Sequence, residues 1–219
     1  MNRTSVFEIQ VPLRQRYKAN PKAALVTDCA HAHGNVADDP FHSIVMPMPR
    51  SGIAVPVGVH GAVGGLHDAP TPGDILCAAF AACQDSSVRM VANILGVRLE
   101  FLEVEVIGDV DVRGTLAMDA QVPVGFQTMR CAVRLRAAKG TNPHSLEKLR
   151  AASQRSCVVG RRSFILPLSR RRSTWPRMKR VVCRWRPNRA PKVRRVCALS
   201  SCQSKTASDA AHRGAQEKL

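Results

Sequence analysis

Two cysteines, Cys83 and Cys157, are the residues of this chain best suited to chemistry. Each belongs to a segment with helix signals, so two thiols are expected on two helices. A thiolate is a nucleophile, and a second thiol can condense with its oxidised form to give a disulfide. In the alternative interpretation both cysteines only pack in the core as small apolar side chains. The sequence pattern alone leaves both interpretations open.

The helix expected to carry Cys83 has a strong start signal at Thr71. Thr71 can cap the first turn, Pro72 suits the first helical position because no amide donor is needed there, and Asp74 completes a capping-box pattern. Apolar residues continue at helical spacing until Gly96 ends the helix. Alanines before Cys83 allow other backbone to come close, so Cys83 is expected to be buried beside another segment.

Cys157 ends a second expected helix, residues 142–157, which is amphipathic and begins at a good capping residue. Between the two helices lies an expected β-hairpin, whose strands cover residues 103–112 and 127–136 and alternate between apolar and polar positions. The outer face of the first strand is acidic and that of the second is basic, so antiparallel pairing brings opposite charges together. These elements predict an α+β fold with an antiparallel sheet packed on a buried helix.

Two further cysteines of the expected domain are interpreted as core residues. Cys131 points inward on the second hairpin strand. Cys77 lies about 240° round the helix from Cys83, so these two thiols cannot meet. The chain has eight cysteines but no CxxC pair or regular framework, which argues against structural disulfides in a reducing compartment.

The first 70 residues give weaker signals. Residues 12–22 are expected to form a short polar helix or turn, residues 23–27 a strand, and residues 51–65 a strand and loop. His31 and His33 have no Cys or acidic partners at ligand spacing, so they are interpreted as surface-loop histidines and no metal site is expected.

Residues 160–219 differ abruptly in composition from residues 1–159. They hold 17 of the 33 Lys and Arg residues and two of the 16 acidic residues, a net charge of +15, whereas the preceding part has a net charge of +2. Apart from short runs such as Val181–Cys183, they show no sustained helical or strand period. The sequence therefore predicts a domain over residues 1–159 and a disordered basic tail over residues 160–219.

A domain of about 150 residues can bury about two-thirds of its unfolded surface, so a real core is expected. The N-terminus has no basic region followed by an apolar run, and no apolar stretch approaches the roughly 18 residues that span a bilayer. We therefore expect a cytoplasmic protein with mostly reduced cysteines and no membrane partner.

The order of these elements resembles the OsmC/Ohr family of thiol-dependent hydroperoxide reductases. An Ala-Ala-Cys helix, a hairpin and a Leu-rich helix running into Ser-Cys-Val carry the resemblance, which covers residues 1–159 and is best from Thr71 to Val159. It implies that Cys83 attacks a hydroperoxide and that Cys157 resolves the product, in oxidative stress defence. It also implies an intertwined homodimer that needs no cofactor and uses an external dithiol as reductant.

The same resemblance implies an essential arginine from the N-terminal region. Arg14, Arg16 and Arg50 are the candidates, and no motif selects among them. Such an arginine would favour the thiolate form of Cys83 by stabilising its charge.

The chain departs from the family pattern at two places. The family helix usually opens Asn-Pro-Glu, whereas this chain has Thr71-Pro72-Gly73, which leaves Asp74 as the substitute acid. The family places its second cysteine at the start of a last helix followed by a last strand, whereas here Cys157 runs into a basic stretch, so the domain is expected to be incomplete at its C-terminal end. The alternative function is then an inactive OsmC-like protein whose tail binds nucleic acid or another polyanion without specificity.

We hypothesise that a reading-frame change in GC-rich coding DNA produced this tail, because it is rich in Arg, Pro and Ser and starts where the closing helix is expected. Sequencing of the locus tests the hypothesis. An uninterrupted frame that encodes the same tail in independent isolates would exclude it.

Overall fold

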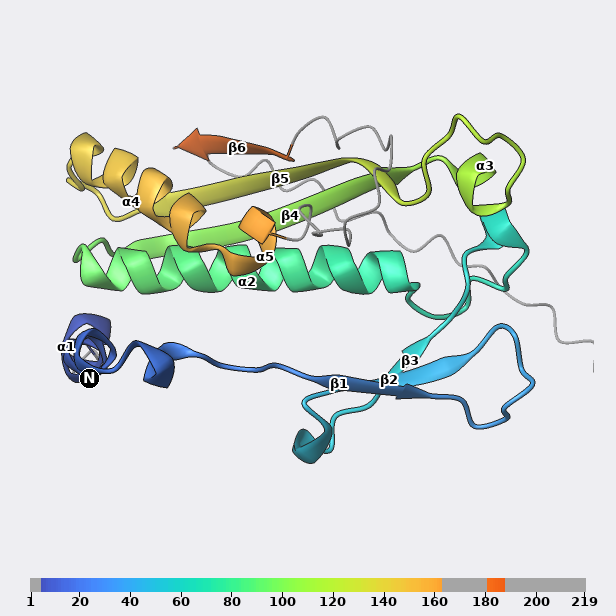
Figure 1. Ribbon diagram of the computed structural model, residues 1–219. Coiled ribbons are helices and arrows are strands. Elements are labelled where there is room, and N and C mark those ends of the chain that lie inside the picture. Colours follow the sequence, from blue (N-terminus) through green and yellow to red (C-terminus); the bar gives the residue numbers. More distant parts are fainter. Residues whose placement is uncertain (1–4, 163–180, 188–219) are drawn as a thin grey trace, which may run out of the picture. The chain divides into compact units, whose positions relative to one another are not determined.

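The computed structural model describes residues 5–162 and 181–187 (Figure 1). The described elements, in chain order, are α1 (Val6–Ala19), η1 (Pro21–Ala24), β1 (Ala30–His33), β2 (Ser43–Pro47), η2 (Pro49–Ser51), β3 (Val55–Val57), η3 (Gly61–Val63), α2 (Pro72–Ile94), β4 (Leu99–Val110), α3 (Val112–Thr115), β5 (Phe126–Ala137), α4 (Pro143–Ser156), α5 (Val158–Arg162) and β6 (Val181–Pro187). The strands form two three-stranded sheets, in the orders β1-β2-β3 and β4-β5-β6. The predicted α+β class is therefore confirmed.

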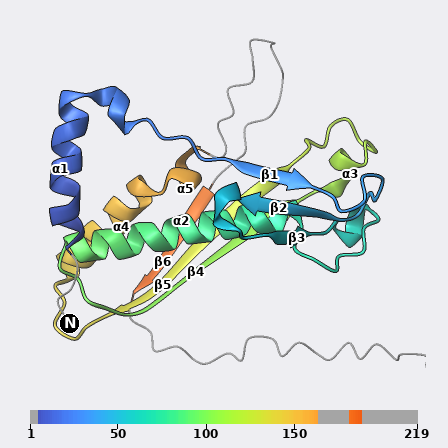
Figure 2. The same cartoon turned by 90° about the horizontal axis from the view of Figure 1, so that it is seen from below.

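The core lies between the hairpin β4–β5 and the helices α2 and α4. The helix α2 packs against β4, and α4 lies alongside α2 and runs antiparallel to it (Figures 1 and 2). Buried apolar side chains of α2, β5 and α4 form one cluster, against which partly buried side chains of β4 pack, and its fully buried members include Phe80, Met129 and Leu149. This layer holds both candidate thiols.

The start of α2 follows the predicted capping box. The Asp74 amide N–H donates to Thr71 Oγ1 at 3.3 Å, and the Thr71 amide N–H donates to Asp74 Oδ2 at 2.9 Å. The helix ends at Ile94, and Gly96 adopts a left-handed φ of 66° just beyond it. The buried positions recur at helical spacing and are Phe80, Gln84, Ser87, Val88, Val91 and Ala92.

Among the helices of residues 5–162, α2 alone is long and apolar enough to cross a membrane. This finding corrects the expectation that no stretch approaches such a length. The sequence has no unbroken apolar run of about 18 residues. The helix α2 is nevertheless apolar on average, because alanine and small polar residues separate its large apolar side chains. Its buried stripe packs against β4 and α4, which accounts for its apolar character as a core helix.

The hairpin confirms the predicted alternation. On β5, Met129, Cys131, Val133 and Leu135 are buried, and the residues between them point outward. Cys131 is 1% exposed and pairs across the hairpin with Val106. Its assignment to the core is therefore confirmed.

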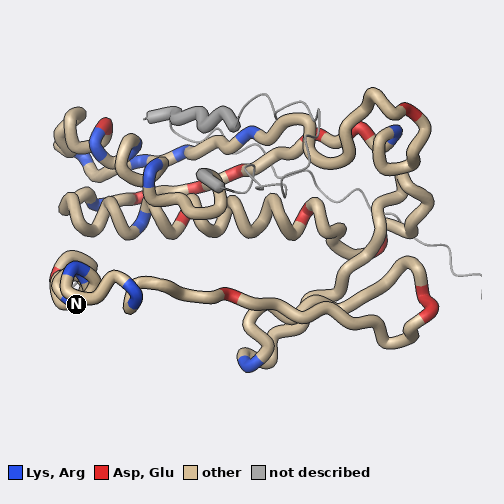
Figure 3. Tube along the Cα trace, viewed as in Figure 1, with Lys and Arg blue, Asp and Glu red and all other residues tan. Residues whose placement is uncertain are grey.

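The outer face of the hairpin carries the predicted pairs of opposite charge (Figure 3). The Glu103 and Arg134 side chains are 2.6 Å apart, and Asp109 and Arg130 are 2.9 Å apart. These pairs are exposed and screened by solvent, so each contributes little to stability. The register of the hairpin follows instead from the alternation of buried and exposed residues along its strands.

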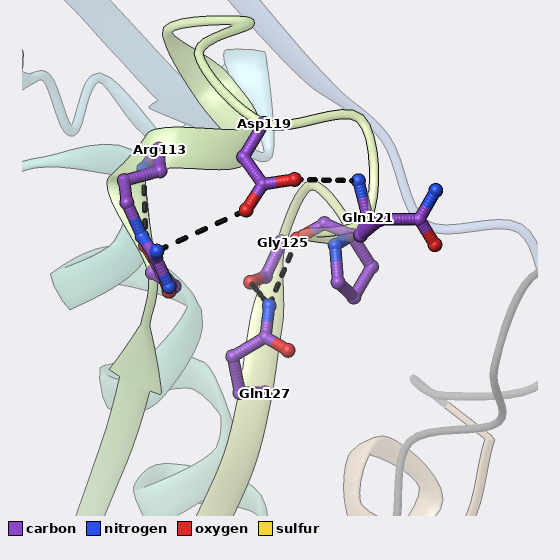
Figure 4. Close-up of polar contacts among 7 residues, drawn as sticks. Arg113, Asp119, Gln121, Gly125 and Gln127 are labelled. Atoms are coloured by element: carbon purple, nitrogen blue, oxygen red, sulfur yellow. Dashed lines mark hydrogen bonds and ion pairs between the residues drawn. The ribbon is translucent and has the colours of Figure 1, made fainter.

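The connection between β4 and β5 is long but is held by its own polar contacts (Figure 4). The Asp119 carboxylate lies 3.9 Å from the Arg113 guanidinium and accepts a hydrogen bond from the Gln121 amide at 2.9 Å. The Gln127 side-chain amide donates to the Gly125 carbonyl at 3.0 Å. This segment is thus ordered locally at the end of the hairpin.

The N-terminal predictions are only partly right. A helix is present, but it spans Val6–Ala19 rather than residues 12–22, because Ser5 caps it. Residues 23–27 form no strand: Pro21–Ala24 is a 3-10 turn, and Leu25 and Val26 that follow are about 80% exposed with no strand paired to them in the described structure. An apolar run alone does not make a strand without a partner edge.

The strands of this region lie elsewhere. β2 pairs antiparallel with β1 and with β3, and β3 falls within the predicted strand and loop over residues 51–65. His31 and His33 are exposed, but they lie on β1 rather than in a loop.

Among the described residues, two short elements follow Cys157. The helix α5 crosses the predicted boundary between residues 159 and 160, and β6 starts at the apolar run Val181–Cys183. β6 pairs in parallel with β5, with Val181 opposite Met129. The predicted disorder of the tail concerns mostly residues 163–180 and 188–219, which lie outside the described residues.

Candidate active site

The two predicted catalytic cysteines belong to the same apolar cluster. Cys83 is partly buried on α2, at the edge of its buried stripe, and packs against the cluster. Cys157 is 1% exposed and is a member of it. The Cys157 amide N–H caps the end of α4 by donating to the Ser153 carbonyl at 3.2 Å. The two thiols therefore come from two helices that pack together.

Gly160 on α5 lies between Cys157 and the helix α2. A Cβ added at Gly160 would lie 2.6 Å from Phe80 Cε2 and 3.1 Å from Cys157 Sγ, so the ring and the thiol both adjoin this glycine. The Gly160 amide N–H also donates to Cys157 Sγ at 3.3 Å. Phe80 lies three residues before Cys83, close to one helical turn. Cys157 is thus packed beside the part of α2 that carries Cys83.

No sequence pattern predicted α5, because a segment of five residues is too short to show a helical period. The structure nevertheless starts a helix directly after Cys157. A short helix therefore follows Cys157, where only a basic stretch was expected.

Substitution of Gly160 by alanine is expected to destabilise the fold. The new methyl group would overlap the buried Phe80 ring and press on Cys157, and overpacking of this kind typically costs about 1–3 kcal/mol. Urea unfolding of Gly160→Ala measures the loss. Gly61→Ala is the matched control, because its added Cβ meets its nearest neighbour, His67 Cβ, at an ordinary 3.9 Å. Equal stability of Gly160→Ala and the unmodified chain would contradict this packing.

The structure does not select among the three candidate arginines. The Arg14 guanidinium donates to Gln10 Oε1 at 3.1 Å, and Arg16 stacks on the Tyr17 ring within the same helix. Arg50 is exposed on η2. Within residues 5–162, no hydrogen bond or ion pair joins any of the three to Cys83.

Asp74, the expected substitute acid, is engaged in capping α2. Its Oδ2 accepts hydrogen bonds from the Thr71 hydroxyl at 2.7 Å and from the Thr71 amide, and these hydrogen bonds lower the pKa of Asp74 below its ordinary value. The nearby His67 and His60 add smaller lowering effects. These two histidines, whose rings are 4.3 Å apart, were not identified from sequence because neither spacing nor a motif connects them to Asp74.

An aromatic ring adjoins the position where the family carries its first acid. A Cβ added at Gly73 would lie 3.5 Å from Phe126 Cζ, and one added at Gly108 would lie 2.3 Å from Phe126 Cε1. The Phe126 ring therefore packs between the first turn of α2 and β4. The start of the helix is apolar on this side instead of acidic.

Cys77 lies near this ring, because a Cβ added at Gly108 would meet both Phe126 and Cys77 Sγ, the latter at 3.4 Å. Burial, followed by the nearby Asp74 carboxylate, raises the pKa of the Cys77 thiol, against a smaller lowering effect of the Gly108 amide. A thiol with a raised pKa remains protonated and is a poor nucleophile. Cys77 also packs against the core cluster, as expected from its position on the helix.

A charged cluster that was not predicted joins the loop before β2 to the segment before α2. The His42 ring lies 2.8 Å from the Asp39 carboxylate through Nδ1 and 3.1 Å from that of Asp68 through Nε2. Hydrogen bonds to Asp39 and then Asp68 raise the pKa of His42 above 6.5. The pKa of Asp39 is lowered chiefly by the Phe41 amide and then by His42, and that of Asp68 chiefly by His42.

This cluster predicts a defined pH dependence. Because the pKa of His42 is raised, the stability that its ion pairs add to the fold is fully present below pH 6.5 and is lost as the pH rises through the raised value. The lowered pKa values of Asp39 and Asp68 mean that their contribution is present above pH 3.8 and is lost as the pH falls through the lowered values. His42→Ala is therefore expected to lower the melting temperature most between these limits and to have no effect at high pH.

Thermal unfolding of the two proteins across the pH range measures this effect. His33→Ala, at an exposed position on β1, is the matched control, and it should not change the melting temperature in a pH-dependent way. A His42→Ala effect that is the same at pH 5 and pH 9 would contradict the ion-pair account.

Comparison with known proteins agrees with this architecture. Residues 65–163 match the family model described as OsmC-like protein. An OsmC-like protein from Mycoplasma pneumoniae has a TM-score of 0.53 at 8% identity, covering 74% of this chain and 97% of its own. An OsmC-like protein of unknown function from Vibrio cholerae has a TM-score of 0.51 at 11% identity, covering 62% and 92%.

An organic hydroperoxide resistance protein from Legionella pneumophila is 24% identical, with a TM-score of 0.45, and the match covers 62% of this chain and 88% of its own. No curated protein sequence matches the chain. The family match covers the central region, and the two folds with the higher TM-scores are OsmC-like as well. Residues 65–163, which include Cys83 and Cys157, therefore form an OsmC-like domain.

Proposed function

We propose that this chain is a cytoplasmic thiol-dependent peroxidase that reduces organic hydroperoxides to alcohols in oxidative stress defence. The observation that carries the proposal is the position of Cys157 in the OsmC-like domain. It packs beside Phe80 on α2, about one turn from Cys83, and both cysteines join one apolar cluster. Two thiols on packed helices suit a pair in which one is oxidised and the other resolves it.

In the proposed reaction the Cys83 thiolate attacks the terminal oxygen of the hydroperoxide. The O–O bond breaks, the sulfur becomes a sulfenic acid, and the alkoxide leaves and takes up a proton to give the alcohol. Cys157 then attacks the Cys83 sulfur, the S–O bond breaks, and the hydroxyl leaves as water with the proton of the Cys157 thiol. An external dithiol reduces the resulting disulfide by two electrons, so no bound cofactor is needed.

The surroundings of Cys83 favour an organic substrate. Cys83 is partly buried and packs against the core cluster, whose side chains, including Phe80 on the same helix, are apolar. An alkyl or aryl group on the peroxide can bury its surface against such walls, whereas a small polar peroxide gains little there.

The proposal includes an arginine and a second copy of the chain. Arg14, Arg16 and Arg50 remain the candidates to stabilise the Cys83 thiolate. The N-terminal segments leave apolar side chains uncovered in a single copy, among them Leu25 and Val26 at about 80% exposure. A homodimer would cover such surface and could bring an arginine of one copy to the thiol of the other.

Turnover with cumene hydroperoxide and dithiothreitol tests the proposed activity. The full chain should consume cumene hydroperoxide faster than hydrogen peroxide at equal concentration. No consumption above the rate of dithiothreitol alone, by a protein that is folded by circular dichroism, would refute the peroxidase proposal.

The composition of the tail supports a second candidate function. Residues 160–219 carry a net charge of +15 and could neutralise several phosphates of a nucleic acid. The chain would then be an inactive OsmC-like protein that binds polyanions without sequence specificity. DNA binding that falls steeply with salt, together with absent peroxide consumption, would favour this function over the first.

A further inference from the structure

The contact between α2 and α4 contains buried polar side chains. Of the four buried polar residues in the described structure, Thr71 caps α2, whereas the other three lie on the buried faces of these two helices: Gln84, Ser87 and Ser153. Buried polar groups are normally hydrogen-bonded, so each needs a partner or a reason. Ser153 has one, because its hydroxyl donates to the Arg150 carbonyl at 3.1 Å.

Gln84 is the exception. It is 1% exposed, and its side-chain Nε2 has no hydrogen-bond partner among residues 5–162 and 181–187. A buried donor without a partner destabilises a fold by about 1–3 kcal/mol. An apolar residue of the same size would avoid this cost, so the amide points to a use that arises in another state of the protein.

Gln84 lies on α2 near the contact between Phe80, Gly160 and Cys157. Gln84 follows Phe80 by four residues, so the two side chains lie one above the other on the same face of α2. The Phe80 ring adjoins Gly160, which also touches Cys157. On the antiparallel α4, Ser153 precedes Cys157 by four residues and is likewise buried. In this antiparallel contact Gln84 thus lies one turn along α2 from Phe80, on the level of Ser153, and because helical side chains tilt toward the N-terminus its amide is directed toward Phe80 and Cys157.

We propose that Gln84 is a positioning residue for the resolution step, in which its Nε2–H donates a hydrogen bond to Cys157 Sγ as this sulfur attacks. The proposal rests on the peroxidase function proposed above. During the attack the Cys157 S–H bond breaks, the new S–S bond to Cys83 forms, and the Cys83 hydroxyl leaves as water with the released proton. Negative charge builds up on Cys157 Sγ before the S–S bond is complete.

A hydrogen bond to the charged form favours that form. The Gly160 amide already provides one donor to this sulfur, at 3.3 Å, and Gln84 would provide a second. Because the Gln84 donor lacks a partner in the reduced structure, its hydrogen bond would be gained only as the charge develops. Interactions that are stronger in the transition state than in the ground state accelerate a step.

The test separates the two chemical steps in the full-length chain. Reduced protein is mixed with one equivalent of cumene hydroperoxide, sulfenic acid is trapped with dimedone at successive times, and loss of the remaining thiols reports disulfide formation. In Gln84→Leu, oxidation of Cys83 should proceed at the unmodified rate, whereas disulfide formation should slow by on the order of tenfold. The sulfenic acid should accumulate, and thermal stability should rise because the unpaired donor is gone.

The matched control is Ser87→Ala, which removes a buried polar group from the same helix face one turn further from Phe80. It should leave both rates unchanged. Gln84→Met serves if the leucine variant does not fold, because methionine has the length of glutamine and no donor.

Disulfide formation at the unmodified rate in a folded Gln84 variant would overturn the proposal. Slower oxidation of Cys83 would overturn it as well, because it would assign the amide to the first step. Failure of the peroxidase function itself is distinguishable, because the unmodified chain would then form no trappable sulfenic acid on Cys83.

Discussion

Replacement of Cys83 by serine is expected to abolish peroxide consumption. A serine hydroxyl stays protonated near neutral pH and cannot replace a thiolate as the nucleophile that breaks the O–O bond. Consumption of cumene hydroperoxide in the presence of dithiothreitol should fall to the rate without protein, while the fold is retained because Cys83 is only partly buried. Wild-type turnover in Cys83→Ser would refute the peroxidase account and leave the OsmC-like fold without its proposed activity.

Variants of three other cysteines show whether this loss is specific. Cys157→Ser should allow one turnover and leave Cys83 as a trappable sulfenic acid, because the attacking thiol survives and the resolving thiol does not. Cys77→Ala and Cys131→Ala should alter stability and leave reactivity per folded molecule intact, since both pack in the core. Equal loss of activity in all four variants would indicate a common folding defect instead.

Phe80→Ala should have the largest effect on stability. Phe80 is 1% exposed and is the largest of the fully buried side chains in the described structure. Its ring packs against the Gly160 backbone of α5. Truncation of a buried phenylalanine to alanine costs about 3–5 kcal/mol, a large part of the roughly 5–15 kcal/mol that stabilises a typical domain. Urea unfolding followed by circular dichroism measures the change in the free energy of unfolding.

Phe7→Ala is the matched control, because Phe7 on α1 is 52% exposed. Its effect should stay within about 0.5 kcal/mol. A loss below about 1 kcal/mol in Phe80→Ala would mean that α5 and the end of α4 do not pack on α2 as described.

The central elements could be predicted from sequence because their signals are local. The capping box at Thr71 and Asp74 marks the start of α2, and the alternation of apolar residues marks β5 and its buried Cys131. The same signals gave the two helices that carry Cys83 and Cys157. What they could not give is the contact at Gly160, which depends on residues 80 positions apart in the chain.

The N-terminal region was predicted less well for a related physical reason. Residues 23–27 are apolar enough for a strand, yet no described strand pairs with them, and the strands of this region are short segments such as Val55–Val57. Strand formation depends on cross-strand neighbours, which a local pattern does not contain.

The polar part of the candidate site was also missed. Helical spacing from Phe80 to Gln84 and Val88 could have predicted that Gln84 is buried, but not that its amide lacks a partner in the described structure. The ion pair between His42 and Asp68 joins residues 26 apart in the sequence, and no motif signals it.

Quantitation of free thiols before and after one equivalent of cumene hydroperoxide, with mapping of the disulfide formed, tests the central claim most directly. The fully reduced chain has eight thiols. The account predicts that two of them are lost and that peptide mapping identifies a single bond between Cys83 and Cys157. Eight unreacted thiols, or a disulfide that omits Cys83, would contradict it.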